Sequence, residues 1–257
     1  MESVNDIKNR LEAASTHMLP QLITEYENDG RAGVKKLVEG AKKRITALEK
    51  EKKRMDAMWM YERKYSEFSC ICGIDEAGRG PLAGPVVAGA VVFPRDCDIL
   101  YINDSKKLSE KKREELYDII YEKSISAAVG IVGPERIDEI NILQATYEAM
   151  RQAIGKLSVV PDLLLNDAVT IPDVNIRQVP IIKGDAKSVS IGAASIIAKV
   201  TRDRIMKEMD EIYPEYGFAG HKGYGSAAHI EVIERIGPCP IHRRSFIKNF
   251  NIPDSLR

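Results

Sequence analysis

Short runs of apolar residues after residue 66 constrain the fold of this chain more than any other feature. They span residues 69–75, 84–93, 125–133, 161–167 and 176–185, and Gly or Pro borders most of them. The first two, 69–75 and 84–93, are short and almost continuously apolar, which is typical of strands that are buried on both faces of a sheet. Two runs follow one another directly and helical segments separate the rest. The pattern predicts an α/β fold, a mixed β-sheet flanked by helices.

The segments between these runs carry helical signals. Ser109 is a candidate N-cap for the helix that follows it, and Pro134 stands where the next helix begins. Residues 188–213 read as a long helix with one face of small residues, which suits close packing against a sheet.

Residues 1–66 have a different character and predict a charged, helical N-terminal extension. Val34, Val38, Ala41 and Ile45 recur at roughly helical spacing. Lys and Arg exceed Asp and Glu in the second half of this segment. Two interpretations stay open: a solvated helical appendage, or a basic arm that contacts phosphates. We expect residues 67–257 to form the catalytic domain.

The composition excludes several classes of protein. The 257 residues have a formal net charge of zero, so overall basicity does not indicate a nucleic-acid partner. The sequence shows no run long enough for a membrane span and no signal peptide at its start. Its four cysteines are too few and too scattered for a disulfide framework. We expect a cytoplasmic protein that has no membrane association and no obligate protein partner.

Carboxylates stand where the predicted strands end. Asp75 and Glu76 follow the first apolar run, Asp167 ends the fourth, and Asp185 comes just before the long helix. Catalytic groups of open α/β sheets gather at such strand ends. A site made only of Asp and Glu suits hard cations such as Mg²⁺ or Mn²⁺. Two such ions can activate water and stabilise the leaving oxygen of a phosphodiester.

Glycines follow the first pair of acids. In the segment Gly78-Arg79-Gly80, the absence of side chains at two positions lets the backbone approach a ligand closely.

Five sequence blocks resemble the signature blocks of bacterial ribonuclease HII. They are GIDEAGRGPLAGPVVAGAVV, NDSKKLS, KGDAKSVSIGAASIIAKVTRDR, YGFAGHKGYG and GPCPIHRRSF, and they occur in family order between about residues 71 and 247. The resemblance implies a ribonuclease H-like fold with a helical C-terminal region that binds substrate. It also implies a metal-dependent endonuclease that cuts the RNA strand of RNA–DNA hybrids. Such an enzyme further incises 5′ of single ribonucleotides in duplex DNA, by a two-metal mechanism that leaves 5′-phosphate and 3′-hydroxyl ends.

The resemblance also assigns roles to residues. The catalytic, metal-binding carboxylates would be Asp75, Glu76, Asp167 and Asp185, with two Mn²⁺ or Mg²⁺ ions in the reacting complex. The substrate would be held by a further group: Gly78, Arg79 and Gly80 at the ribose, Ser105 and Lys106 at phosphates, and Tyr224 at the neighbouring sugar. Many members follow the third acid with Gly, whereas this chain has Ala168, and Asp162 is a rival for that third position.

The C-terminal part of the sequence also contains basic and histidine residues. The basic stretch 242–250 either contacts nucleic acid or packs its aromatic residues and leaves its charges in solvent. The histidines lack the spacing of a zinc motif. Alternative functions are another metal-dependent nuclease of the same superfamily, such as ribonuclease HIII or a resolvase, and a non-catalytic RNA–DNA hybrid binding module. Ribonuclease HIII would have a β-rich N-terminal platform, whereas residues 1–66 predict helices.

Overall fold

The computed structural model of the chain describes residues 2–253. The chain divides into two compact units, Met1–Ala57 and Met58–Arg257, and each is described by itself.

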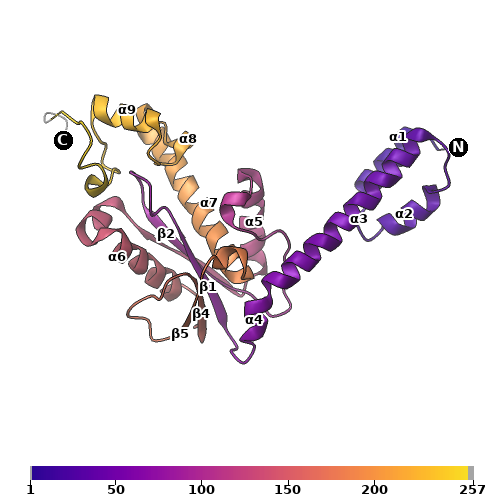
Figure 1. The fold of residues 1–257 in the computed structure, drawn as a ribbon, viewed down its shortest axis with the longest axis horizontal. Helices are drawn as coiled ribbons and strands as arrows, with labels where there is room; N and C mark the ends of the chain where they lie inside the picture. Colours follow the sequence, from indigo (N-terminus) through magenta and orange to yellow (C-terminus); the bar gives the residue numbers. More distant parts are fainter. Residues whose placement is uncertain (1, 254–257) are drawn as a thin grey trace. The chain divides into compact units, whose positions relative to one another are not determined.

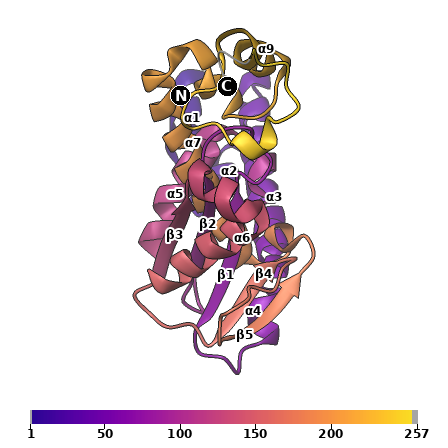
Figure 2. The same ribbon diagram turned by 90° about the vertical axis from the view of Figure 1, so that its left-hand side faces the viewer.

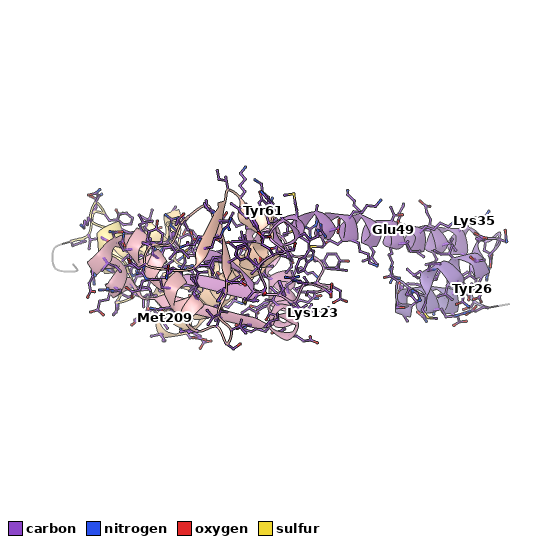
Figure 3. All side chains as sticks on the ribbon, turned by 90° about the horizontal axis from the view of Figure 1, so that it is seen from below. Tyr26, Lys35, Glu49, Tyr61, Lys123 and Met209 are labelled. Carbon is purple, nitrogen blue, oxygen red and sulfur yellow. The ribbon has the colours of Figure 1, made fainter. Side chains whose placement is uncertain are left out.

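The first unit consists of three helices, as the sequence predicts. They are α1 (Val4–Ala13), α2 (Leu19–Tyr26) and α3 (Ala32–Met58), whose last residue belongs to the second unit. Their apolar faces share a small core that contains Ile7, Leu19 and Val34. The Arg44 guanidinium donates to the Leu11 carbonyl at 2.7 Å and so ties α3 to the end of α1. Polar side chains such as Lys35 and Glu49 stand out from α3 (Figure 3).

The second unit contains all the strands of the described chain. Its elements are α4 (Met60–Lys64), β1 (Ile71–Ala77), β2 (Val86–Val92), η1 (Ser105–Lys107), α5 (Glu110–Lys123), β3 (Ser126–Val132), α6 (Pro134–Gly155), β4 (Leu163–Asp167), β5 (Arg177–Ile181), η2 (Gly184–Ala186), α7 (Val189–Ile212), η3 (Pro214–Tyr216), α8 (Phe218–His221), α9 (Ala227–Ile236) and η4 (Arg244–Phe246). The predicted caps are confirmed, since Ser109 caps α5 and Pro134 is the first residue of α6.

The strands form one mixed sheet in the order β3-β2-β1-β4-β5. The pairs β1–β2 and β2–β3 are antiparallel, whereas β1–β4 and β4–β5 are parallel. The carboxyl ends of β1 and β4 therefore lie at the same edge of the sheet, which brings the segments after these two strands together.

Helices cover both faces of the sheet (Figure 1). Helix α6 lies on one face, and α5 and α7 lie on the other. The small residues of β2 explain the close approach of α7: a Cβ at Gly89 would collide with the carbonyl of Ala194 and lie 2.8 Å from a side-chain carbon of Ile197. The predicted mixed sheet flanked by helices is confirmed.

Helix α4 is fastened to the beginning of α7. One carboxylate oxygen of Glu62, Oε1, accepts hydrogen bonds from the Ser188 hydroxyl at 2.6 Å and from the Ser190 N–H at 3.1 Å. Because a helix N-terminus carries partial positive charge, a carboxylate there stabilises it. The first turn of α7 is thereby fixed just after η2, which carries Asp185.

The C-terminal part of the second unit is helical, in agreement with the sequence. Figure 2 shows α9 and the C-terminal segment beyond one end of the sheet. Phe218 and Met206 belong to a small apolar core here. All four cysteines are free. Within residues 2–253, we find no helix that is both long and apolar enough to cross a membrane.

Candidate active site

A cavity of about 540 Å³ opens at the edge of the sheet where β1 and β4 end. All the residues proposed from the sequence line it, together with five that the sequence did not single out. The lining residues are Asp75, Glu76, Ala77, Gly78, Arg79, Gly80, Ser105, Lys106, Ile142, Asp167, Asp185, Ser195, Lys199, Tyr224 and Phe246. The structure thus brings residues from five separate sequence blocks to one place.

Asp75 and Glu76 lie on β1 itself, because the strand continues two residues beyond Asp75 to Ala77. Asp75 is only 5% exposed and faces Gly89 of β2 in the sheet register. Its Oδ1 accepts the N–H of Glu76 at 2.7 Å. The Glu76 carboxylate lies 3.3 Å from the Arg79 guanidinium. The side chains of the pair are therefore held at the cavity by rigid backbone.

The carboxylates repel one another. Burial, together with the charges of Glu76 and Asp167, raises the pKa of Asp75 well above its ordinary value. Burial also raises the pKa of Glu76, although Arg79 opposes the shift. The pKa of Asp185 is raised by burial and by the neighbouring charges of Asp104 and Asp167. Such a cluster is stable when it binds protons or a cation.

Asp167 occupies the position at the end of β4 that the sequence assigned to it. Its Oδ1 accepts the Gly184 N–H at 2.7 Å, which links β4 to the turn that carries Asp185. The next residue, Ala168, has a φ of +56°, in the left-handed region that glycine adopts most easily. The turn is therefore kept without glycine. The rival Asp162 instead accepts the backbone N–H groups of Ser69 and Cys70, at 2.8 and 2.9 Å, and does not line the cavity.

The donor chemistry of the cavity fits a hard divalent cation, since every anionic group in it is a carboxylate. The side chains are not arranged as a finished ligand set. Among residues 2–253, no group of three or more His, Cys, Asp or Glu side chains converges to hold a metal ion. One oxygen each of Asp75, Glu76 and Asp167 is engaged by an internal hydrogen bond. A bound cation would compete with these contacts.

The two glycines of the loop differ in their backbone conformation and in the space around them. Gly78 has a φ of +92°, and a Cβ there would overlap the Arg202 side chain and lie 2.8 Å from the Pro85 carbonyl oxygen. At Gly80 a Cβ would meet nothing within 4 Å, and φ is not in the left-handed region. Internal packing therefore requires glycine at position 78 and leaves position 80 open.

Two backbone donors of this loop are unused. We find no acceptor within residues 2–253 for the N–H groups of Arg79 and Gly80, although both residues line the cavity. Free N–H groups beside a cluster of carboxylates are able to bind a hydroxyl or phosphate oxygen of a ligand.

Ser105 and Lys106 approach the cavity from η1. Ser105 is buried, and its Oγ lies 3.0 Å from the Oγ of Ser195 on α7. Lys106 is exposed and free to reach an anion. Ser195 and Lys199 were missed from the sequence. They are four residues apart on α7 and therefore lie on the same face of this helix. This spacing, in the helix that follows Asp185, was the signal in the sequence that could have identified them.

Tyr224 is 45% exposed at the cavity, and a pair of histidines holds its backbone. This histidine pair consists of His229 and His242, whose Nε2 atoms lie 3.0 Å apart. Since the Cys239 N–H donates to Nδ1 of His242, His242 donates through Nε2 to His229. His229 then donates through Nδ1 to the Tyr224 carbonyl at 2.9 Å. Burial lowers the pKa of both histidines to about 4.

The basic stretch 242–250 agrees only in part with the two interpretations from the sequence, which were contact with nucleic acid, or packed aromatic residues with charges in solvent. Phe246 packs its ring toward the cavity. Arg243, whose charge we expected in solvent or on nucleic acid, is instead fully buried.

Together, the sheet and the acidic cavity at the carboxyl ends of β1 and β4 define a ribonuclease H-like hydrolase. Family comparisons resolve the type: the Ribonuclease HII model matches residues 72–249, and the Ribonuclease HII N-terminal domain model matches residues 3–66. The chain belongs to the ribonuclease HII family. As such it is a ribonuclease H, an endonuclease for the RNA of RNA–DNA hybrids.

Individual relatives agree with this assignment. The Ribonuclease HII of Lachnoclostridium phytofermentans is 60% identical over 96% of this chain and 97% of its own length. That of Clostridioides difficile is 51% identical over 96% and 98%. Among solved structures, the ribonuclease H2 of Pyrococcus horikoshii is 30% identical with a TM-score of 0.58, covering 71% of this chain and 97% of the other. Bst-RNase HIII in complex with Mn²⁺ is 17% identical, with a TM-score of 0.51, and covers 71% and 63%, so it shows likeness of fold alone.

Proposed function

We propose that this enzyme incises duplex DNA on the 5′ side of a single embedded ribonucleotide, as well as cutting the RNA strand of longer hybrids. The products carry 5′-phosphate and 3′-hydroxyl ends. The observation that carries this proposal is the meeting, in one cavity, of a carboxylate cluster with two unused N–H groups, those of Arg79 and Gly80.

The four carboxylates are the proposed hydrolytic centre. Asp75, Glu76, Asp167 and Asp185 would hold two Mg²⁺ or Mn²⁺ ions. When bound, the ions supply an activated water and stabilise the leaving oxygen. The mutual repulsion of these buried and half-buried groups favours cation binding, because a cation removes the cost of keeping several negative charges together.

The loop is the proposed sugar reader. The N–H groups of Arg79 and Gly80 would donate to the oxygen of a ribose 2′-hydroxyl, and a deoxyribose would leave them without a partner. A site built in this way rejects the analogue without the hydroxyl by roughly 10⁴–10⁵-fold. The exposed amine of Lys106 would contact a phosphate, and the ring of Tyr224 would contact the neighbouring deoxyribose.

The two parts of the chain have separate proposed roles. Residues 67–257 contain every residue of the proposed centre. Residues 1–66 are the proposed accessory helical extension, of which α4 packs within the second unit. Whether the basic stretch of α3 contacts phosphates is tested by the deletion described in the Discussion.

The test uses end-labelled duplexes of one sequence that carry zero, one or four ribonucleotides, incubated with Mg²⁺ or Mn²⁺. We expect cleavage of the second and third duplexes, with the cut mapped to the 5′ side of the single ribonucleotide, and no cut in the first. Asp75→Asn is the control that excludes a contaminating nuclease. Cleavage of all three duplexes at similar rates would indicate a general nuclease, and binding without cleavage would indicate a hybrid-binding module.

A further inference from the structure

Two buried arginines lie beneath the loop that follows β1. Arg243 is 0% exposed and Arg202 is 1% exposed. Within residues 2–253 neither guanidinium forms an ion pair with a carboxylate. A buried cation without a counter-charge is costly unless hydrogen bonds satisfy it. Here the acceptors are backbone carbonyls, so the two side chains have a structural task that a neutral apolar side chain could not perform.

Arg243 holds the carbonyls of the sugar-reading residues. Its Nη2 donates to the Gly78 carbonyl at 2.6 Å, its Nη1 to the Arg79 carbonyl at 2.8 Å, and its Nε to the Gly84 carbonyl at 3.0 Å. Arg202 instead donates to the carbonyls of Pro85, Ala83 and Lys222, at 2.9, 3.0 and 2.9 Å, and to neither Gly78 nor Arg79.

The direction of each peptide group follows from these bonds. In a trans peptide the C=O and the N–H point to opposite sides of the chain. The Gly78 carbonyl shares its peptide with the Arg79 N–H, and the Arg79 carbonyl shares its peptide with the Gly80 N–H. Because Arg243 binds both carbonyls from the interior, both N–H groups are turned toward the opposite side, where the cavity lies.

The charge of Arg243 also acts on these donors. A cation that binds a carbonyl polarises the whole peptide group, which strengthens the hydrogen bond that its N–H donates. Burial and the charge of Arg202 lower the pKa of Arg243 to about 9, so the side chain stays cationic at neutral pH.

We propose that Arg243 is a positioning residue for ribose recognition, which fixes and polarises the two peptide groups that offer the Arg79 and Gly80 N–H groups to the 2′-hydroxyl. This inference rests on the proposed function of the loop. It assigns to a residue of the C-terminal stretch a part in sugar selection, although its side chain is sealed from substrate.

The test compares Arg243→Lys with Arg202→Lys in the full-length protein. Lysine keeps the positive charge and loses the planar fork that binds two carbonyls at once. Both substitutions remove a buried guanidinium that makes three backbone hydrogen bonds, so each serves as a control for lost stability. Thermal unfolding would measure that loss.

The decisive quantity is the single-turnover rate constant on a one-ribonucleotide duplex, with enzyme in saturating excess. This rate constant does not depend on the folded fraction, so a purely structural role would leave it unchanged. Because two hydrogen bonds to the hydroxyl are weakened, we expect Arg243→Lys to lower it about 10- to 100-fold. The loss in Arg202→Lys should be at least about fivefold smaller. Affinity for the matched all-DNA duplex, which reports phosphate contacts, should change by less than about twofold.

The outcomes separate the two proposals. Equal slowing by both lysine variants, or an unchanged rate in Arg243→Lys, would overturn the positioning role while leaving the loop as the sugar reader. A wild-type enzyme that cuts the all-DNA duplex as fast as the ribonucleotide duplex would refute the proposed function itself. If Arg243→Lys does not fold, Arg243→Gln, which removes the buried charge and keeps an N–H donor, is measured in its place with the same criteria.

Discussion

Replacing Gly80 with alanine should impair substrate binding while leaving folding unaffected. The added methyl group meets no atom of the protein within 4 Å, and the backbone there is not left-handed. Replacing glycine by alanine at such a position changes the unfolding free energy by roughly 0 to +1 kcal/mol, because the unfolded chain loses freedom. The same methyl group would stand beside the Gly80 N–H, where we place the ribose.

The expected loss of activity follows from the hydrogen bonds at stake. A shift of the sugar that lengthens its hydrogen bonds to the two backbone donors, without leaving them unpaired, costs about 1–3 kcal/mol of transition-state binding. This corresponds to a fall in kcat/KM of roughly five- to 150-fold, since each 1.4 kcal/mol is a factor of about ten. The variant should therefore be as stable as the wild type and clearly slower on a one-ribonucleotide duplex.

Gly78→Ala is the matched variant, in which we expect the added methyl group to lower the stability of the fold. Its φ of +92° costs an alanine about 1–3 kcal/mol, and the methyl group must also displace Arg202 from the Pro85 carbonyl. We expect a loss of several kcal/mol in urea unfolding, whereas Gly80→Ala should lose nothing. Gly80→Ala with wild-type kcat/KM would refute the placement of the ribose at this loop. A loss of stability in Gly80→Ala as large as that in Gly78→Ala would instead contradict the finding that position 80 has room for a side chain.

The remaining predictions concern the acids, the tyrosine, the extension and the histidines. Asp75→Asn or Asp185→Asn should abolish cleavage while duplex affinity and thermal stability stay near wild type; near-normal turnover at saturating metal would remove that residue from the centre. Tyr224→Ala should slow cleavage of a one-ribonucleotide duplex more than that of a four-ribonucleotide hybrid, and equal slowing would exclude the sugar contact. Deleting residues 1–57 should leave measurable cleavage but weaken binding and flatten its salt dependence if the basic stretch contacts phosphates; a folded, wholly inactive product would show that the extension helps to build the site. The histidine pair is neutral when folded, with pKa values lowered from 6.5 to about 4, so the unfolded chain takes up protons first as pH falls. Urea unfolding should therefore show stability lost between pH 6.5 and 4, by up to about 3 kcal/mol per histidine, and a His242→Gln variant that shows the same slope would contradict this.

The sequence predicts the sheet, and the position of the acids near the strand ends, because both depend on local signals. Continuous apolar runs identify buried strands, and β1 and β4 are parallel neighbours, so acids near their carboxyl ends must meet. The position of Asp167 survives the substitution of glycine by Ala168 because the left-handed turn is formed by alanine at modest cost.

The parts that could not be predicted depend on contacts between distant segments. In the basic stretch, Arg243 is buried and Arg244 is not, and no local pattern distinguishes these adjacent side chains. Arg243 is buried because its guanidinium binds backbone carbonyls of the Gly78–Pro85 segment, and only the folded chain brings this segment next to it. For the same reason, the sequence explained both loop glycines by one cause, whereas the structure shows that Gly78 is required by the packing of Arg202.

The hydrogen bond from Arg243 to the Arg79 carbonyl joins residues that are 164 positions apart. During translation, β1 and the loop leave the ribosome long before the side chain that fixes the loop has been added. A nascent chain is therefore able to assemble β1, β2 and β3 early, since those strands pair with near neighbours, while its sugar-reading loop still lacks its anchor. Ribose selection would then arise only after residue 243 has been added and has packed beneath the loop.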